Sequence, residues 1–254
     1  MAGHSKWANI KHKKGRADAA RAKVFSKISK EIMVAASGGG GNIDDNIQLR
    51  ALVQKAKSVS MPKDNIERAI KKGTGELEGG KLEEGSYEGY VSGGVAVVVK
   101  VLSDNKNRSA AAVRHAFSKA GANLAEQGSV SRMFERKGHI LINKDQAEED
   151  IILELVLDAG AEDLKSSTTQ YEVLTDPSDF DLVSDVLTKA DINMESSELT
   201  LIPNVINEVT DLSQAQAIMK FIDTLEEIDD VQDVYSNFDI SEDIAKAINE
   251  EQQC

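Results

Sequence analysis

The chain has 254 residues, of which 41% are hydrophobic and 29% charged, and its formal net charge is −13. Its only cysteine, Cys254, excludes a disulfide or a cysteine-ligated metal cluster within one chain. The sequence has no apolar run of about 18 residues and no secretory signal, so we expect a cytoplasmic protein that does not enter a membrane. A mitochondrial transit peptide is a weaker alternative, because the basic start is rich in lysine rather than in arginine and serine.

The charge is divided unevenly along the chain. Residues 1–72 contain 16 lysines and arginines against 6 acidic residues, and residues 73–137 contain 9 against 8. Residues 138–254 contain 5 against 29. Such asymmetry is typical of an electrostatic binding module joined to an acidic one. The negative net charge of the whole chain therefore does not indicate what residues 1–72 bind. We expect this basic segment to bind a polyanion.

The basic segment, residues 1–78, is expected to be a three-helix bundle preceded by an N-terminal arm. The first helix is expected over residues 17–36. Its apolar residues recur at helical spacing on one face: Val24, Phe25, Ile28, Ile32 and Ala35. Its lysines share the opposite face: Lys23, Lys27 and Lys30. The face with the lysines is therefore expected to form a basic stripe.

Two further helices are expected after the glycine run at residues 37–42. This run follows a helix and lacks the phosphate-binding GxxxxGK[ST] pattern, so we interpret it as a hinge. The second helix places Arg50 and Lys57 outward, and the short third helix ends with Lys71 and Lys72 before Gly73. The bundle is therefore expected to have a basic exterior.

Past residue 79 the pattern predicts two α/β domains, one inserted in the other, and hence an α+β fold class. A middle domain is expected from residues 79–137 and 204–240. It would contain two strands joined at Gly93-Gly94, a helix capped by Asn107, and strands at 129–135, 205–210 and 231–238. The inserted acidic domain, residues 138–203, has the element order β-α-β-β-α-β of a ferredoxin-like unit, which the middle domain is expected to repeat. Residues 241–254 are expected to form an acidic C-terminal tail.

Several long strings carry a resemblance to a known family. They are "AGHSKWANIKHKK" at the start, "NIQLRALVQKAKSVSMPKDNIERAIKKG" at 46–73, "YEGY" at 87–90, "SDNKNRS" at 103–109 and "DVQDVYSNFD" at 230–239. Over nearly its whole length the chain resembles the YebC family, bacterial proteins whose mitochondrial relative is a translational activator of cytochrome oxidase. The resemblance implies a basic helical domain and two α/β domains around a cleft. It also implies DNA-binding transcriptional regulation or, alternatively, ribosome-associated translation. Arg132 departs from the family, in which we expect an aromatic residue.

Nucleic-acid binding requires cations that can follow a phosphate backbone. The arm supplies several, and Trp7 among them could stack on a base, although packing of Trp7 on the bundle is a slightly stronger alternative. Lys106 and Arg108 lie at an expected helix N-terminus, which favours a phosphate, the alternative being an ordinary helix cap. The candidate nucleic-acid-binding residues are Lys6, Trp7, Lys11, His12, Lys13, Lys14, Arg16, Lys23, Lys27, Lys30, Arg50, Lys57, Lys71, Lys72, Lys106 and Arg108.

The sequence contains no recognisable catalytic motif such as GxSxG or HExxH, and His4 and His12 have no carboxylate or thiol partners nearby. We therefore expect neither enzymatic activity nor a metal or cofactor, and we predict a monomeric regulator of gene expression. Few side chains are placed for bidentate base reading, which favours backbone and shape recognition and leaves DNA and ribosomal or transfer RNA both open. The acidic domain could bind a basic partner such as a ribosomal protein.

Overall fold

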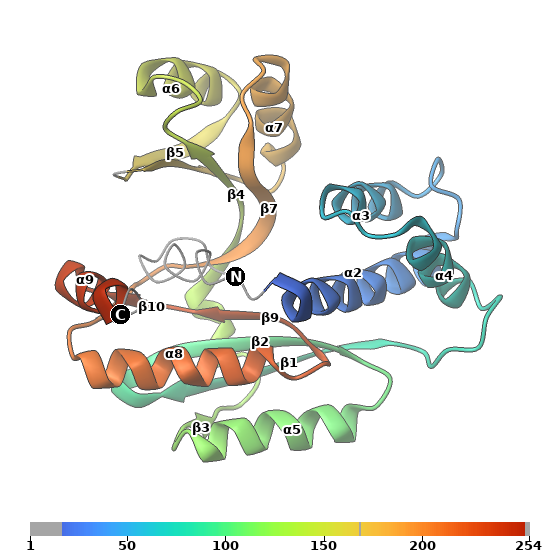
Figure 1. The fold of residues 1–254 in the computed structure, drawn as a ribbon, viewed down its shortest axis with the longest axis horizontal. Helices are drawn as coiled ribbons and strands as arrows, with labels where there is room; N and C mark the ends of the chain where they lie inside the picture. Colours follow the sequence, from blue (N-terminus) through green and yellow to red (C-terminus); the bar gives the residue numbers. More distant parts are fainter. Residues whose placement is uncertain (1–16, 168, 252–254) are drawn as a thin grey trace.

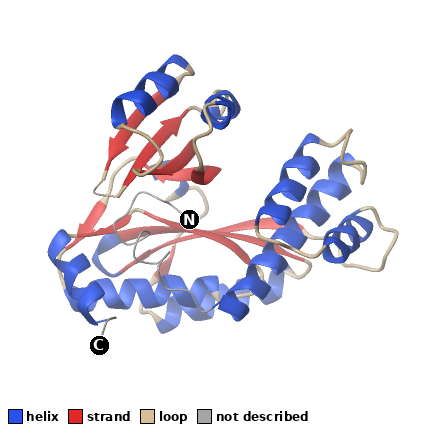
Figure 2. Cartoon of the chain, turned by 45° about the horizontal axis from the view of Figure 1, so that its top comes forward, coloured by secondary structure: helices blue, strands red, loops and turns tan. Residues whose placement is uncertain are grey.

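The computed structural model describes residues 17–167 and 169–251. The chain is a mixed α+β protein with three parts, as Figure 1 shows: a helical domain, a long sheet with helices on one side, and a smaller sheet with its own helices. The expected α+β class is confirmed. Figure 2 shows how the helices of the middle domain lie along one side of its sheet.

The helical domain consists of α2 (Ala17–Gly39), α3 (Ile47–Ser58) and α4 (Lys63–Gly73), as expected. Asn46 fixes the start of α3, because its Oδ1 accepts a hydrogen bond from the Leu49 amide at 3.0 Å. Its Nδ2 donates to the carbonyl oxygens at the end of α2, which ties the two helices together. The core includes Ile28, Ile32, Leu49, Val53 and Ile66. Val24, expected on the packed face, is 40% exposed, and α2 continues to Gly39 instead of ending near residue 36.

The middle domain contains an antiparallel sheet whose strand order is β3-β1-β2-β9. These strands are β1 (Glu83–Val91), β2 (Val95–Ser103), β3 (Asn123–Leu124) and β9 (Val231–Ser236). Helices α5 (Lys106–Lys119) and α8 (Leu212–Glu226) pack on one face, where the rings of Phe117 and Phe221 meet edge to face with their centroids 4.9 Å apart. A short parallel pair completes the domain: β8 (Asn207–Val209) and β10 (Phe238–Ile240).

Four expectations for the middle domain and its surroundings were wrong. Its central strands β1 and β2 form a hairpin, whereas in a ferredoxin-like βαββαβ sheet the central strands are not consecutive. The expected strand at 129–135 is mostly a turn with a 3-10 helix, η2 (Ser131–Met133), and the α5 cap is Asn105, not Asn107. Residues 242–251 form helix α9 (Glu242–Glu251) instead of a tail, because Ile244 and Ile248, one turn apart, pack into the core.

The acidic domain has the expected βαββαβ order and an antiparallel sheet with strand order β5-β6-β4-β7. Its elements are β4 (Phe134–Asn143), α6 (Glu149–Asp158), β5 (Ala161–Ser166), β6 (Gln170–Thr175), α7 (Phe180–Lys189) and β7 (Met194–Pro203). Helices α6 and α7 cover one face over Ile140, Ile142 and Val173. Strands β4 and β7 pair from Phe134↔Pro203 onward and so connect this domain to the middle domain.

Candidate nucleic-acid interface

The candidate residues fall into three groups. Those of the arm lie outside the described residues: Lys6, Trp7, Lys11, His12, Lys13, Lys14 and Arg16. The others form two groups, side chains that are exposed without an ion pair and side chains that hold the fold together, with Lys23 and Arg50 intermediate between them. This division determines which of them are available to a ligand.

The available cations lie at the C-terminal ends of α3 and α4. Lys57, Lys71 and Lys72 are exposed, and none forms an ion pair with another residue in the described ranges. Arg68 has the same properties and lies one turn before Lys71 and Lys72, although it was not among the candidates from the sequence. The helix dipoles of α3 and α4 stabilise cations at these ends, which keeps the charge concentrated there.

Two further candidates have intermediate roles. Lys23 is partly buried and lines a pocket of about 330 Å³ between α2 and the turn before β9. Arg50 is exposed, but its Nε donates to the Ile43 carbonyl at 3.2 Å and its Nη2 to the Asp44 carbonyl. Arg50 therefore stabilises the loop before α3 while keeping part of its guanidinium in solvent.

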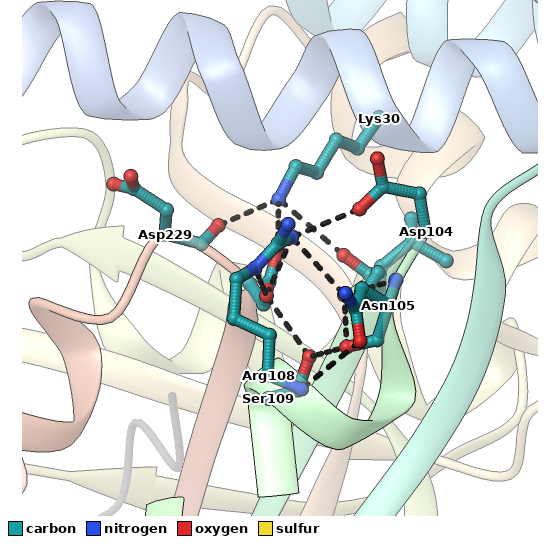
Figure 3. A network of polar contacts seen from close by, with 9 residues as sticks. Lys30, Asp104, Asn105, Arg108, Ser109 and Asp229 are labelled. Carbon is teal, nitrogen blue, oxygen red and sulfur yellow. Dashed lines mark hydrogen bonds and ion pairs between the residues drawn. The ribbon is translucent and has the colours of Figure 1, made fainter. Parts of the chain in front are cut away.

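Lys27 and Lys30 do not lie on a solvent-facing stripe, which corrects the expectation for α2. Lys27 Nζ donates to the Gln232 carbonyl at 2.6 Å. Lys30 Nζ donates to the Leu102 carbonyl at 3.3 Å, to the Asp229 carbonyl at 2.7 Å and to Asp230 Oδ1 at 3.1 Å, as Figure 3 shows. These three acceptors match the three donors of an ammonium group. The polar face of α2 is therefore the face that docks on the middle domain.

Asp230 is the shared partner of Lys30, Arg108 and Ser109, which Figure 3 labels. Its carboxylate accepts hydrogen bonds from Arg108 Nε at 3.1 Å, from Ser109 Oγ at 2.9 Å and from Lys30. The side chain is only 6% exposed. Burial alone would raise the pKa of Asp230, but the hydrogen bonds from Ser109, Arg108 and Lys30 outweigh it and lower the pKa below its usual value. Asp230 therefore remains ionised and links α2, α5 and β9.

The N-terminus of α5 differs from the phosphate site considered from the sequence. Arg108 is bound by Asp230 and by Asp104 Oδ1 at 2.9 Å, and Lys106 pairs with Glu83. The Asn105 side chain accepts from the Arg108 amide at 3.1 Å. A phosphate would have to compete with these carboxylates, so the helix-cap alternative describes the observed contacts.

The inner surfaces of the three domains carry acidic side chains. Lys55 of α3 forms an ion pair with Glu31 at 3.1 Å and also interacts electrostatically with Asp233 of β9 and Glu198 of β7. The same three carboxylates add to burial in raising the pKa of Tyr235. Residues from all three domains therefore lie close enough to interact electrostatically, and three carboxylates surround the single cation Lys55.

Within residues 17–167 and 169–251, no group of three or more His, Cys, Asp or Glu side chains is placed to hold a metal ion. No helix in the same ranges is long and apolar enough to cross a membrane.

Two family models match the chain. The one described as the TACO1/YebC protein N-terminal domain matches residues 5–76, and the one described as the TACO1/YebC second and third domain matches residues 82–238. The chain belongs to the TACO1/YebC family. This confirms the resemblance noted from the sequence strings.

Similar proteins cover almost the whole chain. A "Probable transcriptional regulatory protein" of Syntrophobacter fumaroxidans is 53% identical over 98% of this chain and 100% of its own length. One of the same description from Geobacter sulfurreducens is 53% identical over 95% of this chain and 97% of its own. The crystal structure of a conserved hypothetical protein from Aquifex aeolicus is 45% identical, with a TM-score of 0.83, and the match covers 94% of this chain and 98% of that one.

Proposed function

We propose that this TACO1/YebC protein is a nucleic-acid-binding regulator of transcription that acts through its helical domain. The regulatory role is supported by the names of its relatives. The observation that carries the binding proposal is the group of exposed cations at the ends of α3 and α4 that have no ion-pair partner among the described residues: Lys57, Arg68, Lys71 and Lys72. We call this group the α3/α4 cation group.

Lysine and arginine side chains of this kind bind phosphates and release condensed counterions. They position a protein on nucleic acid but read no base edges, so we expect binding that depends strongly on salt and weakly on sequence. The lysines and arginine of the arm, residues 1–16, would extend the same contact. The protein is proposed to act in the cytoplasm as a monomer, without a cofactor and without catalysing a reaction.

The resemblance implied that the domains surround a cleft, and we propose that nucleic acid binds outside it. The space shared by the three domains is bordered by Glu31, Glu198 and Asp233, which would repel phosphates. Lys55 of α3 faces this space. Lys57 lies two positions further on, about 200° around the helix axis, and therefore points away from it. The outer surface of α3 and α4 is therefore the favoured contact. The acidic domain would repel other polyanions or bind a basic protein.

The test is equilibrium binding of labelled duplex DNA and of a structured RNA across a salt series, with the full-length chain. In the triple variant Lys57→Glu, Lys71→Glu, Lys72→Glu, we expect weaker binding and a salt slope reduced by about 0.9 for each duplex phosphate that the variant no longer neutralises. The matched control, Lys119→Glu, Lys189→Glu, Lys220→Glu, makes the same charge change at exposed positions outside the helical domain.

Equal weakening in the two variants would mean that net charge alone matters, which contradicts a site on α3 and α4. Absence of binding to either nucleic acid would contradict the proposal as a whole. Clear preference for structured RNA or ribosomes over duplex DNA would replace transcription with the alternative role in translation.

A further inference from the structure

The sheet of the acidic domain has a second face, opposite α6 and α7. Side chains of β4, β6 and β7 alternate, so that His139, Leu141, Leu174, Glu198 and Thr200 point to this face. We call it the open sheet face. Leu141 is 6% exposed, Leu174 9% and Thr200 3%, so these side chains have little contact with solvent, whereas Glu198 is exposed.

None of the four hydrophobic clusters formed by the described residues includes Leu141 or Leu174. Their pairing register makes them diagonal neighbours, since His139 lies opposite Leu174 and Leu141 lies opposite Glu172. Two adjacent leucines therefore form an apolar patch that packs in none of the cores. A segment that covers this patch must contribute apolar side chains of its own.

The surroundings of the patch are acidic. Asp163 of β5 and Glu198 of β7 are exposed at its two sides, and Asp163 pairs with Lys165 at 3.7 Å. Glu198, like Asp233 and Glu31 of the other two domains, interacts electrostatically with Lys55 of α3. Residues 138–203 contain 16 acidic residues against 3 lysines. Lys137 and Lys165 also lie on this face, but each pairs with a carboxylate of β5, Glu162 or Asp163. Complementarity therefore favours an occupant that is basic and contains a few large apolar residues.

One segment of this chain has that composition. Residues 1–16 contain five lysines and arginines, no acidic residue, and the apolar side chains of Trp7 and Ile10. They precede α2, whose first turns line the pocket beside Asp229 and, in Figure 1, point to the space between β7 and β9. Sixteen extended residues span about 50 Å, which is sufficient to cross a small domain.

We propose that residues 1–16 bind the open sheet face of the acidic domain, with an apolar side chain on Leu141 and Leu174 and lysines near Asp163 and Glu198. Nucleic acid and the open sheet face would then compete for the arm, a consequence that rests on the proposed function. The binding of the arm to the sheet does not rest on it.

Trp7 is the only tryptophan, so its fluorescence reports on the arm alone. In the full-length chain at low salt we expect blue-shifted emission and poor quenching by acrylamide. In the double variant Asp163→Lys, Glu198→Lys we expect a red shift and about a twofold rise in the quenching constant, since each reversal removes an attraction typical of an exposed ion pair. The matched control, Glu154→Lys, Asp158→Lys, has the same charge change on the outer side of α6 and should resemble the original chain.

Three outcomes would overturn the proposal. The first is quenching of Trp7 in the original chain as strong as that of a free tryptophan derivative. The second is an equal change in the double variant and its control. The third is protection that disappears on dilution, which would mean that the arm binds a second copy of the chain. Far-UV circular dichroism of both variants verifies that the sheet is retained.

Discussion

The ammonium nitrogen of Lys30 lies 3.1 Å from Oδ1 of Asp230, and this ion pair joins the helical domain to the middle domain. The hydrophobic core of the helical domain draws on residues 25 to 70 only, so among the described residues no hydrophobic cluster crosses this joint. Hydrogen bonds from Lys27 and Lys30 of α2 cross it instead. The docking of α2 on the middle domain is therefore mainly polar.

Asp230→Asn should destabilise the protein by about 3 kcal/mol, a typical cost of removing one partner from a buried ion pair. The amide keeps the volume of the carboxylate but leaves Lys30 and Arg108 without their shared anion. Urea unfolding followed by circular dichroism would measure the change. Asp229→Asn is the matched control, because Lys30 contacts only the backbone carbonyl of Asp229 and its side chain is exposed. Equal destabilisation in the two variants would show that the Asp230 carboxylate has no special role.

The same residue predicts a pH dependence. The pKa of Asp230 is lowered in the folded protein, so its ionised form stabilises the fold above the usual aspartate pKa of about 3.9. This contribution should decrease as the pH falls below that value and through the lowered pKa. The difference in unfolding free energy between the original chain and Asp230→Asn should therefore be constant from about pH 5 to about pH 7 and smaller at about pH 3. A difference that stays constant over this whole range would contradict the prediction.

Local periodicity predicted much of the fold, because it depends on neighbouring residues. The spacing of Ile28 and Ile32 indicated α2, and alternation indicated the strands of the acidic domain. The destination of Lys30 could not be predicted in this way, since its partner Asp230 lies 200 residues further along the chain. A lysine that faces solvent and a lysine that faces another domain occupy the same polar positions in the helical periodicity of the sequence.

The order of strands in the middle sheet could not be predicted from the sequence for a related reason. It depends on the pairing of β2 with β9, which are separated by the whole acidic domain. Helix α9 could have been found, because Ile244 and Ile248 have helical spacing, but the acidic composition favoured a tail. Of the candidate site, the sequence identified Lys57, Lys71 and Lys72 but not Arg68.

Glu88→Gln should loosen the loop that carries Arg132. The buried Glu88 carboxylate accepts hydrogen bonds from the amides of Gly128 at 2.9 Å, Val130 at 2.7 Å and Ser131 at 2.9 Å. Although burial opposes ionisation, these amides lower the pKa of Glu88. An uncharged amide accepts more weakly, and its NH₂ group would face backbone donors, so we expect a destabilisation of about 1–3 kcal/mol. Faster tryptic cleavage after Arg132 would report the loosening.

The control for this loop is Glu84→Gln, an exposed glutamate four residues earlier on the same strand and the same face. It should leave the cleavage rate at Arg132 unchanged. If Glu88→Gln is cleaved no faster than Glu84→Gln, the three hydrogen bonds do not hold the loop.

Asp163→Lys, Glu198→Lys should bind nucleic acid more tightly than the original chain, if the arm both binds phosphates and occupies the open sheet face. Weakening the intramolecular site makes the lysines of residues 1–16 available, whereas the α3/α4 cation group is unchanged. The control Glu154→Lys, Asp158→Lys adds the same positive charge, so any increase common to both variants reflects net charge and not the release of the arm. We expect an increase in affinity of about fivefold in the first variant over the control, equivalent to about 1 kcal/mol. Binding is measured by fluorescence anisotropy at low salt. Equal affinities of the variant and its control would mean either that the arm does not bind phosphates or that it does not bind the open sheet face. The Trp7 quenching data would decide between the two.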